Sequence, residues 1–177
     1  IPSPEICNEI DDDCNGIIDD GLAETITIAA AGDTVFCQGT SVDLIATYTG
    51  ISVQWKKNGT AIPCATTSTY TANKSGYYTC ETTGDCSTTE SSQIHVLVNK
   101  NPNASISAGG PTTFCTGGSA VLTEAAVAGC TYQWYKGATP IAGATSLTYT
   151  ATTSGNYKCR VTKTATGCYK NSNAIAV

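Results

Sequence analysis

The chain has 177 residues, and its nine lysines and arginines stand against fourteen aspartates and glutamates, for a formal net charge of -5 at pH 7. An acidic balance offers no basic field to a polyanion, so we expect neither nucleic acid nor an anionic membrane as a partner. The apolar runs are only a few residues long, far below the roughly 20 residues that span a bilayer, so no membrane insertion is expected.

The segment 4–22 is dense in aspartate and asparagine and is the most chemically specific part of the sequence. From Asp11 it follows the order Asp-x-Asp-x-Asn-Gly-x-Ile-Asp, the first nine positions of an EF-hand calcium loop. Position 12 is Leu22 instead of the usual bidentate glutamate, so Asp20, Asp12 or a backbone oxygen must complete the shell. The expected ligands are therefore Asp11, Asp13, Asn15, Ile17 through its carbonyl, Asp19 and Asp20.

The oxygen-rich composition of this segment also predicts which metal it takes. Carboxylate and amide oxygens favour Ca²⁺, whereas copper prefers imidazole or thiolate ligands. The alternative is an acidic linker that is merely hydrated, but like charges at this density repel one another when no cation is present. We therefore expect calcium as the cofactor.

The rest of the sequence is patterned for β-strands. Runs such as 41–46 and 94–98 alternate or are apolar with β-branched residues, and no stretch carries a helical stripe. Asn58-Gly59 and Ser75-Gly76 are typical turn sequences between such runs. Several short strands with regularly spaced turns predict an all-β sandwich.

This β-rich part is a tandem repeat. Gln-Trp-Lys-Lys at Trp55 matches Gln-Trp-Tyr-Lys at Trp134, and the Cys80 region matches the Cys159 region, both at an offset of 79. A repeat of this length predicts two domains in line. The expected boundaries are an acidic motif at 1–22, a first domain at 23–98, a polar linker at 99–103 and a second domain at 104–177.

A tryptophan followed about 25 residues later by Gly-x-Tyr-x-Cys resembles the immunoglobulin fold. The resemblance implies that the tryptophan fills the core and that the tyrosine closes a corner at the start of strand F. The sequence departs from antibody domains in strand B, where Leu44 and Leu122 stand in place of a cysteine. The residues carried over as core are Trp55, Tyr78, Trp134 and Tyr157.

Two further likenesses point to bacterial surface proteins. Phe-Cys-x-Gly near the start of each repeat and a late Gly-Cys or Gly-Asp-Cys resemble the immunoglobulin-like repeats of adhesin-type proteins in gliding and other surface-active bacteria. Segment 4–22 resembles the Glu-x-Cys-Asn-x-x-Asp-Asp-Asp-Cys-Asx-Gly-x-x-Asp-Asx-Gly motif of bacterial surface proteins, among them a copper-binding one. These resemblances imply an extracellular location at a bacterial cell surface.

Ten cysteines in a small β-rich chain predict disulfides and an oxidising compartment. The alternative, a cytosolic zinc protein, lacks Cys-x-x-Cys pairs and has only His95 as a histidine ligand. The bacterial repeats imply that the early cysteine pairs with the late one in each domain, although four cysteines allow three connectivities. The expected pairs are Cys37–Cys86, Cys115–Cys168, Cys64–Cys80, Cys130–Cys159 and, within the acidic loop, Cys7–Cys14.

No catalytic pattern is present, so the protein is not expected to be an enzyme. His95 lies between Ile94 and Val96 and should face solvent, and no nucleophile elbow or phosphate loop occurs. Tyr77 and Tyr135 could stack on a sugar, or they could cover strand edges or an interface.

The expected function is that of a structural or adhesive extracellular module with a calcium-ordered N-terminal loop. The chain begins without a signal peptide and stops inside an expected strand, which suggests a segment of a longer protein or a processed subunit. Its partners would be other domains of that protein, copies of itself, or a surface glycan or protein ligand. One alternative is a self-assembling subunit of an extracellular filament, and a weaker one is a carbohydrate-binding module of a secreted enzyme.

Overall fold

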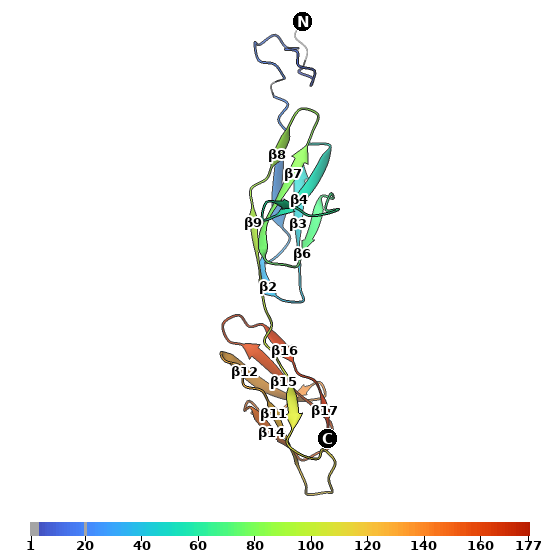
Figure 1. Ribbon diagram of the computed structural model, residues 1–177, viewed down its shortest axis with the longest axis vertical. Helices are drawn as coiled ribbons and strands as arrows, with labels where there is room; N and C mark the ends of the chain where they lie inside the picture. Colours follow the sequence, from blue (N-terminus) through green and yellow to red (C-terminus); the bar gives the residue numbers. More distant parts are fainter. Residues whose placement is uncertain (1–3, 20) are drawn as a thin grey trace. The chain divides into compact units, whose positions relative to one another are not determined.

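The computed structural model describes residues 4–19 and 21–177, so the expected ligand Asp20 lies outside the described residues. The chain divides between Val98 and Asn99 into two compact units, here unit 1 and unit 2 (Figure 1). All regular elements among the described residues are β-strands. No helix in this part of the chain has the length and apolarity of a membrane span.

Unit 1 is a sandwich of two sheets. One sheet has the strand order β1-β3-β6, and the other has the order β2-β9-β7-β4-β5 with β8 paired to β7. The strands of unit 1 are β1 (Ile26–Ala30), β2 (Val35–Cys37), β3 (Val42–Tyr48), β4 (Ser52–Lys57), β5 (Thr60–Ala61), β6 (Thr69–Ala72), β7 (Gly76–Thr83), β8 (Thr88–Glu90) and β9 (Ile94–Asn99).

Unit 2 repeats this arrangement. Its sheets have the orders β10-β11-β14 and β13-β12-β15-β16, and β17 also pairs with β15. The strands of unit 2 are β10 (Ile106–Ala108), β11 (Ala120–Glu124), β12 (Cys130–Lys136), β13 (Thr139–Pro140), β14 (Thr148–Ala151), β15 (Asn156–Lys163), β16 (Tyr169–Asn171) and β17 (Ile175–Ala176).

Each unit is an immunoglobulin-like β-sandwich, as the sequence predicts, and the core residues explain why. Alternate side chains of a strand point to opposite faces, and β3 has the burial pattern of a strand with one face inward. Its Leu44 is fully buried together with Trp55 from the facing sheet, and Leu122 and Trp134 repeat this in unit 2. Leucine therefore fills the strand-B place that a cysteine holds in antibody domains.

The two tryptophans and two tyrosines predicted as core are held by the same hydrogen bonds in both units. The indole Nε1 of Trp55 donates to Thr67 O at 2.9 Å, and that of Trp134 donates to Ser146 O at 2.9 Å. The corner tyrosines donate their hydroxyls four residues upstream, at 2.8 Å in each case; the two pairs are Tyr78 to Lys74 O and Tyr157 to Thr153 O. Burial of an aromatic ring with its polar group satisfied is favourable in free energy.

The cysteine pairs expected within the sandwiches are wrong. Cys37 and Cys168 are both disulfide-bonded, but Cys86 pairs with Cys7 and Cys115 is free, so neither early–late pair forms. In unit 1 the reason is that Cys37 ends β2, whereas Cys86 follows β7 at the other end of the sandwich (Figure 1). In unit 2 the thiol of Cys115 is exposed at the surface, whereas Cys168 is fully buried.

The two remaining expected pairs are also wrong. In one pair the two cysteines differ in burial, and in the other they lie too far apart along the strands. Cys64 is exposed, whereas Cys80 is fully buried. Cys130 lies opposite Lys163 in the ladder, and Cys159 lies opposite Trp134, four residues further along β12. Four residues of strand span about 13 Å, whereas the Cα atoms of a disulfide are at most about 7 Å apart. All four of these thiols are free.

Candidate metal centre

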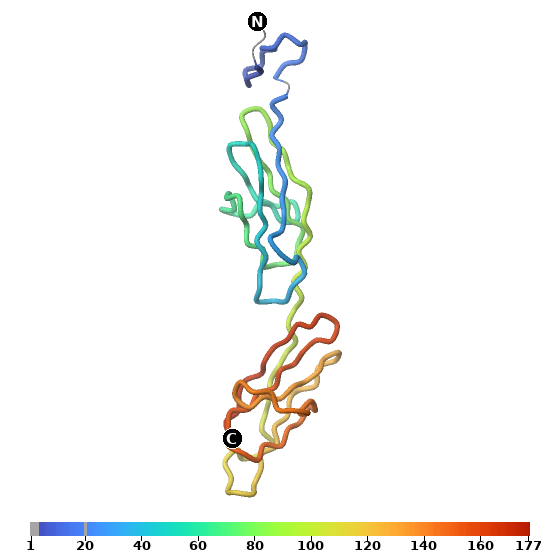
Figure 2. Tube along the Cα trace, turned by 180° about the vertical axis from the view of Figure 1, so that it is seen from behind, coloured from blue at the N-terminus to red at the C-terminus, as the bar shows by residue number. Residues whose placement is uncertain are grey.

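The acidic segment lies beside the β7–β8 turn at one end of unit 1 (Figure 2). It contains no strand among its described residues, and its backbone is folded by its own carboxylates. Asp11 accepts from Asn15 N through Oδ1 at 3.1 Å and from Gly16 N through Oδ2 at 2.8 Å. Asp13 Oδ1 accepts a second contact from Asn15 N, at 3.0 Å. These bonds curl residues 11–16 around the aspartate side chains.

Glu5, Asp11 and Asp13 form the core of the site. One carboxylate oxygen from each of these residues lies within 4.8 Å of the others, and all three side chains are partly buried. Three carboxylates at this separation repel one another strongly unless a cation lies between them. Hard oxygen donors in such a cluster suit Ca²⁺ rather than a soft metal.

The EF-hand scheme did not include Glu5, which lies upstream of the loop. Its Oε1 accepts from Asp13 N at 2.8 Å and its Oε2 from Asp19 N at 3.0 Å, so one side chain joins the two ends of the loop. The scheme expects a bidentate glutamate at position 12, where this chain has Leu22. The signal that could have identified Glu5 is the fixed glutamate that opens the bacterial motif.

The other predicted ligands have different surroundings. Asp19 turns both carboxylate oxygens to backbone amides, with Oδ1 accepting from Asn8 N at 3.1 Å and Oδ2 from Glu9 N at 3.0 Å. Its carboxylate also groups with the sulfurs of Cys7 and Cys86. Asn15 Oδ1 accepts from Ile17 N at 2.8 Å, which is a local Asx-type turn. The structure thus brings Asp11 and Asp13 together with Glu5 and places Asp19 in a second group.

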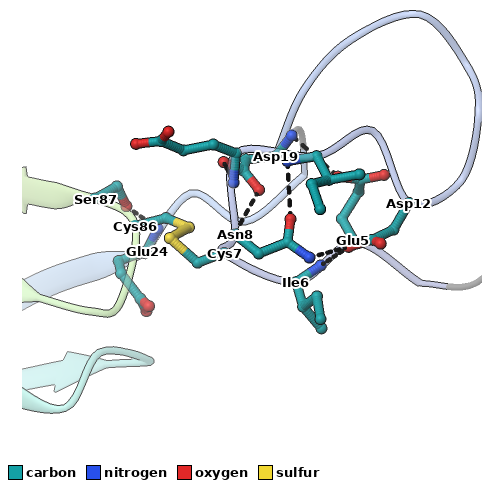
Figure 3. Close-up of a disulfide and its surroundings, with 11 residues drawn as sticks. Glu5, Ile6, Cys7, Asn8, Asp12, Asp19, Glu24, Cys86 and Ser87 are labelled. Atoms are coloured by element: carbon teal, nitrogen blue, oxygen red, sulfur yellow. Dashed lines mark hydrogen bonds between the residues drawn. A yellow bond between two sulfur atoms is a disulfide. The ribbon is translucent and has the colours of Figure 1, made fainter.

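A disulfide fastens the acidic segment to unit 1, and it differs from the expected Cys7–Cys14 pair. Cys7 is bonded to Cys86 in the β7–β8 turn, with a Cα–Cα distance of 5.5 Å (Figure 3). Cys14 is free and exposed. Just beyond the disulfide, Glu24 N donates to Ser87 Oγ at 3.1 Å. Because both sulfurs are oxidised, neither Cys7 nor Cys86 can act as a thiolate ligand, and the donors here are oxygens.

Within the acidic motif itself, every charged side chain is negative. The first lysine or arginine of the chain is Lys56, so the 22 residues of the acidic motif carry seven carboxylates and no basic side chain. A hollow of about 230 Å³ beside the disulfide is lined by Glu5, Ile6, Cys7, Leu22, Glu24, Asp85 and Cys86. The motif therefore supplies no basic side chain of its own to offset these carboxylates.

Outside this centre, the histidine lies at the surface and two free thiols lie in the cores. His95 is exposed and stacks on Tyr77 with ring centroids 4.5 Å apart. The thiols of Cys80 and Cys159 are fully buried, and burial raises the pKa of each to about 11, which keeps them protonated at neutral pH. A nucleophilic cysteine needs the opposite shift and an accessible sulfur.

No known family model and no curated protein matches the chain. Among solved structures it is similar to the human OSCAR ligand-binding domain, with 16% identity and a TM-score of 0.38 over 86% of this chain and 97% of that chain. It is similar to a marsupial T cell receptor, with 12% identity and a TM-score of 0.40 over 88% and 73% of the two chains. A chimeric titin Z1Z2 tandem has 16% identity and a TM-score of 0.32 over 82% and 96%. Values this low say nothing about binding, and the immunoglobulin-like assignment stands on the strand order and the shared cores.

Proposed function

We propose that this chain is a structural or adhesive module of a bacterial cell-surface or secreted protein, with an N-terminal loop ordered by Ca²⁺. Two immunoglobulin-like units suit a role in spacing and presenting other parts of a protein, and such folds serve as structural or binding modules. Disulfides support an oxidising, extracellular setting. The resemblance of the acidic motif and of both repeats to bacterial surface proteins supports the source.

The observation that carries the calcium proposal is the convergence of three carboxylates on a loop that is fastened to the sandwich. The oxygens of Glu5, Asp11 and Asp13 lie within 4.8 Å of one another, and the Cys7–Cys86 disulfide ties the loop to the β7–β8 turn. When calcium is bound, it neutralises these charges and holds the loop in one conformation. The protein's contribution is to hold the carboxylates in place through the backbone bonds to Asp11 and Glu5.

The proposal is tested by isothermal titration calorimetry of the oxidised chain with CaCl₂. We expect one binding event, which the Asp11→Asn and Asp13→Asn double variant removes. Asp33→Asn removes an exposed carboxylate far from the loop in sequence and should leave the binding unchanged. Titration with MgCl₂ and with CuCl₂ completes the series. Tighter binding of copper than of calcium, or calcium binding unaffected by the double variant, would sink the assignment.

The sequence also predicts two alternative functions. A filament subunit is favoured by the opposite formal charges of the two units. A carbohydrate-binding module rests on Tyr135, a partly buried ring on the outer face of unit 2. Binding on a glycan array that Tyr135→Ala abolishes would support the carbohydrate role, and a blank array would remove it.

A further inference from the structure

The net charge of the chain is the sum of two formal charges of opposite sign, one for each unit. Unit 1 holds three lysines and thirteen carboxylates, a formal charge of -10, whereas unit 2 holds six basic residues and one carboxylate, a formal charge of +5. The single carboxylate of unit 2, Glu124, is 1% exposed and lies inside the sandwich. The surface of unit 2 is therefore basic, and the surface of unit 1 is strongly acidic.

Two of the basic side chains of unit 2 lie beside aromatic rings on the outer face of the β12-β15-β16 sheet. Cys159 and Val161 are fully buried and point into the core. Successive side chains of a strand point to opposite faces, so Lys158 and Arg160 point outward. Arg160 Cζ lies 4.9 Å from the centroid of the Tyr135 ring and 4.3 Å from that of Tyr169.

The two tyrosines flank Arg160 from neighbouring strands, and further contacts support the cluster. Lys158 Nζ lies 5.9 Å from the centroid of the Tyr135 ring. Arg160 Nε donates to Asn171 Oδ1 at 3.3 Å, which helps to hold the guanidinium in place. We name Tyr135, Lys158, Arg160 and Tyr169 the cationic face.

The fold does not require this cluster, because unit 1 has different residues at the corresponding positions. At the offset of 79, Glu81 replaces Arg160 and Lys56 replaces Tyr135. There Lys56 Nζ is paired with Glu81 at 2.6 Å and with Glu90 at 3.6 Å, so that face neutralises itself. Among the described residues, the contacts between a cationic side chain and an aromatic ring lie in unit 2. Arginine and tyrosine are enriched where proteins bind partners.

The complementary surface is present on unit 1 of the same chain. Its acidic tip, which we define as residues 4–19 with Asp85, combines carboxylates with exposed aliphatic side chains. Exposed apolar side chains on the same loop add apolar area to this charged tip. The four isoleucines of the tip are each between 58% and 60% exposed: Ile6, Ile10, Ile17 and Ile18.

We propose that the cationic face of unit 2 binds the acidic tip of a second copy of this chain. The cationic face is positively charged and carries aromatic rings, whereas the acidic tip is negatively charged and carries exposed isoleucines. The two surfaces lie on different units of one chain. Such a contact is heterologous, so it links copies head to tail, into a ring where the rotation closes and into an open chain where it does not. The inference gives the filament alternative a specific interface, and it does not depend on the calcium site.

The first test is sedimentation velocity of the intact chain in EGTA, over a range of protein concentrations. At about 10 mM NaCl we expect the average mass to rise with concentration above the 18.2 kDa of one chain. At about 1 M NaCl, where the Debye length falls from about 30 Å to about 3 Å, the association should disappear. A monomer at every concentration in low salt would overturn the proposal, whatever the calcium titration shows.

Charge-reversal variants identify the two surfaces. Lys158→Glu with Arg160→Glu reverses the face, Glu9→Lys with Asp85→Lys reverses the tip, and each should weaken self-association about tenfold or more. An equimolar mixture of the two double variants should associate again, because each then offers the surface that the other needs. The matched control is Lys74→Glu with Lys100→Glu, which alters the net charge equally at exposed sites and should associate more strongly than the face variant.

Three results would contradict this interface. Failure of the mixture to associate would remove the tip–face pairing. Equal loss of association in the control and in the face variant would reduce the effect to net charge alone. Retention of a monomeric wild-type chain on heparin, lost in the face variant, would assign the cationic face to a polyanion instead of a second copy.

Discussion

At the scale of single residues, each of the two cores contains a thiol that has no disulfide partner. Cys80 and Cys159 are fully buried, free, and placed opposite Trp55 and Trp134 in the strand ladders. Their backbone amides donate to serine hydroxyls at 3.0 Å in both units, to Ser91 and to Ser172. With leucine on the facing sheet, each thiol acts as a small apolar side chain.

Buried thiols make stability depend on alkaline pH. Desolvation by burial is the main cause that raises the pKa of each thiol from 9.0 to about 11. The contribution to stability is full below pH 9 and is lost as the pH rises through 11, because only the unfolded chain releases the proton in that range. We expect a loss on the order of 2 kcal/mol per thiol.

This loss can be measured by urea unfolding at intervals from about pH 8 to about pH 11. The Cys80→Val and Cys159→Val double variant provides the control, since it keeps Lys56 and Tyr78, whose raised pKa values act in the same direction. The wild type should lose stability more steeply than this variant. Parallel pH profiles would contradict the assignment of the effect to the thiols.

Alkylation separates the exposed thiols from the buried ones. Iodoacetamide should label Cys14, Cys64 and Cys115 in the native chain, because their side chains are exposed. Cys80 and Cys159 should be labelled only after unfolding, because they are fully buried and their raised pKa disfavours the reactive thiolate. Peptide mass spectrometry reads both sets. Protection of Cys64 in the native chain, relieved by reductant alone, would instead indicate the disulfide with Cys80.

The contrast between aromatic residues and cysteines explains how much the sequence could predict. Trp55 and Tyr78 could be predicted because a short sequence pattern resembles the immunoglobulin fold, which implies a core position for each ring. A disulfide depends on which strand ends meet in space, and Cys86 meets Cys7 from outside the sandwich. Glu5 was missed for a related reason, since it completes the site from upstream of the loop pattern.

At the scale of elements, the Cys7–Cys86 bond turns an irregular segment into part of unit 1. It joins residues 79 apart in the sequence, and the rest of the acidic loop is held mainly by side-chain to backbone hydrogen bonds. A cross-link of that span restricts the unfolded chain and can contribute up to about 4 kcal/mol. The tip is therefore attached to the β7–β8 turn by a covalent bond.

Cys7→Ser tests this attachment. We expect the free energy of unfolding of unit 1 to fall by up to about 4 kcal/mol. The segment 4–19 should also become accessible to proteases, because it is no longer bonded to the β7–β8 turn. Urea unfolding followed by Trp55 fluorescence, with Trp134→Phe as background, reports on unit 1. Cys14→Ser removes an exposed free thiol from the same loop and should have no such effect. Equal stability of the two variants would contradict a structural role for the bond.

At the scale of the whole molecule, the division into units matters more than the chain average. The formal charge of -5 predicts no basic field anywhere, yet unit 2 alone carries +5. The repeat could be found in the sequence because its core positions are shared, whereas the partner-binding potential of unit 2 lies in positions where the repeats differ. Arg160 in place of Glu81 is the clearest of these differences.

The same division predicts that calcium acts on one unit only. At a hundredfold excess over its dissociation constant, Ca²⁺ should raise the free energy of unfolding of unit 1 by about 2.7 kcal/mol, because the acidic loop is part of unit 1. Trp134→Phe leaves Trp55 to report on unit 1, and Trp55→Phe leaves Trp134 to report on unit 2, since both rings are fully buried. Urea unfolding of each variant in calcium and in EGTA should shift only the Trp55 signal. A shift of both signals by the same amount would mean that calcium acts through a site other than the one formed by Glu5, Asp11 and Asp13, and the carboxylate cluster would then lose its assigned role.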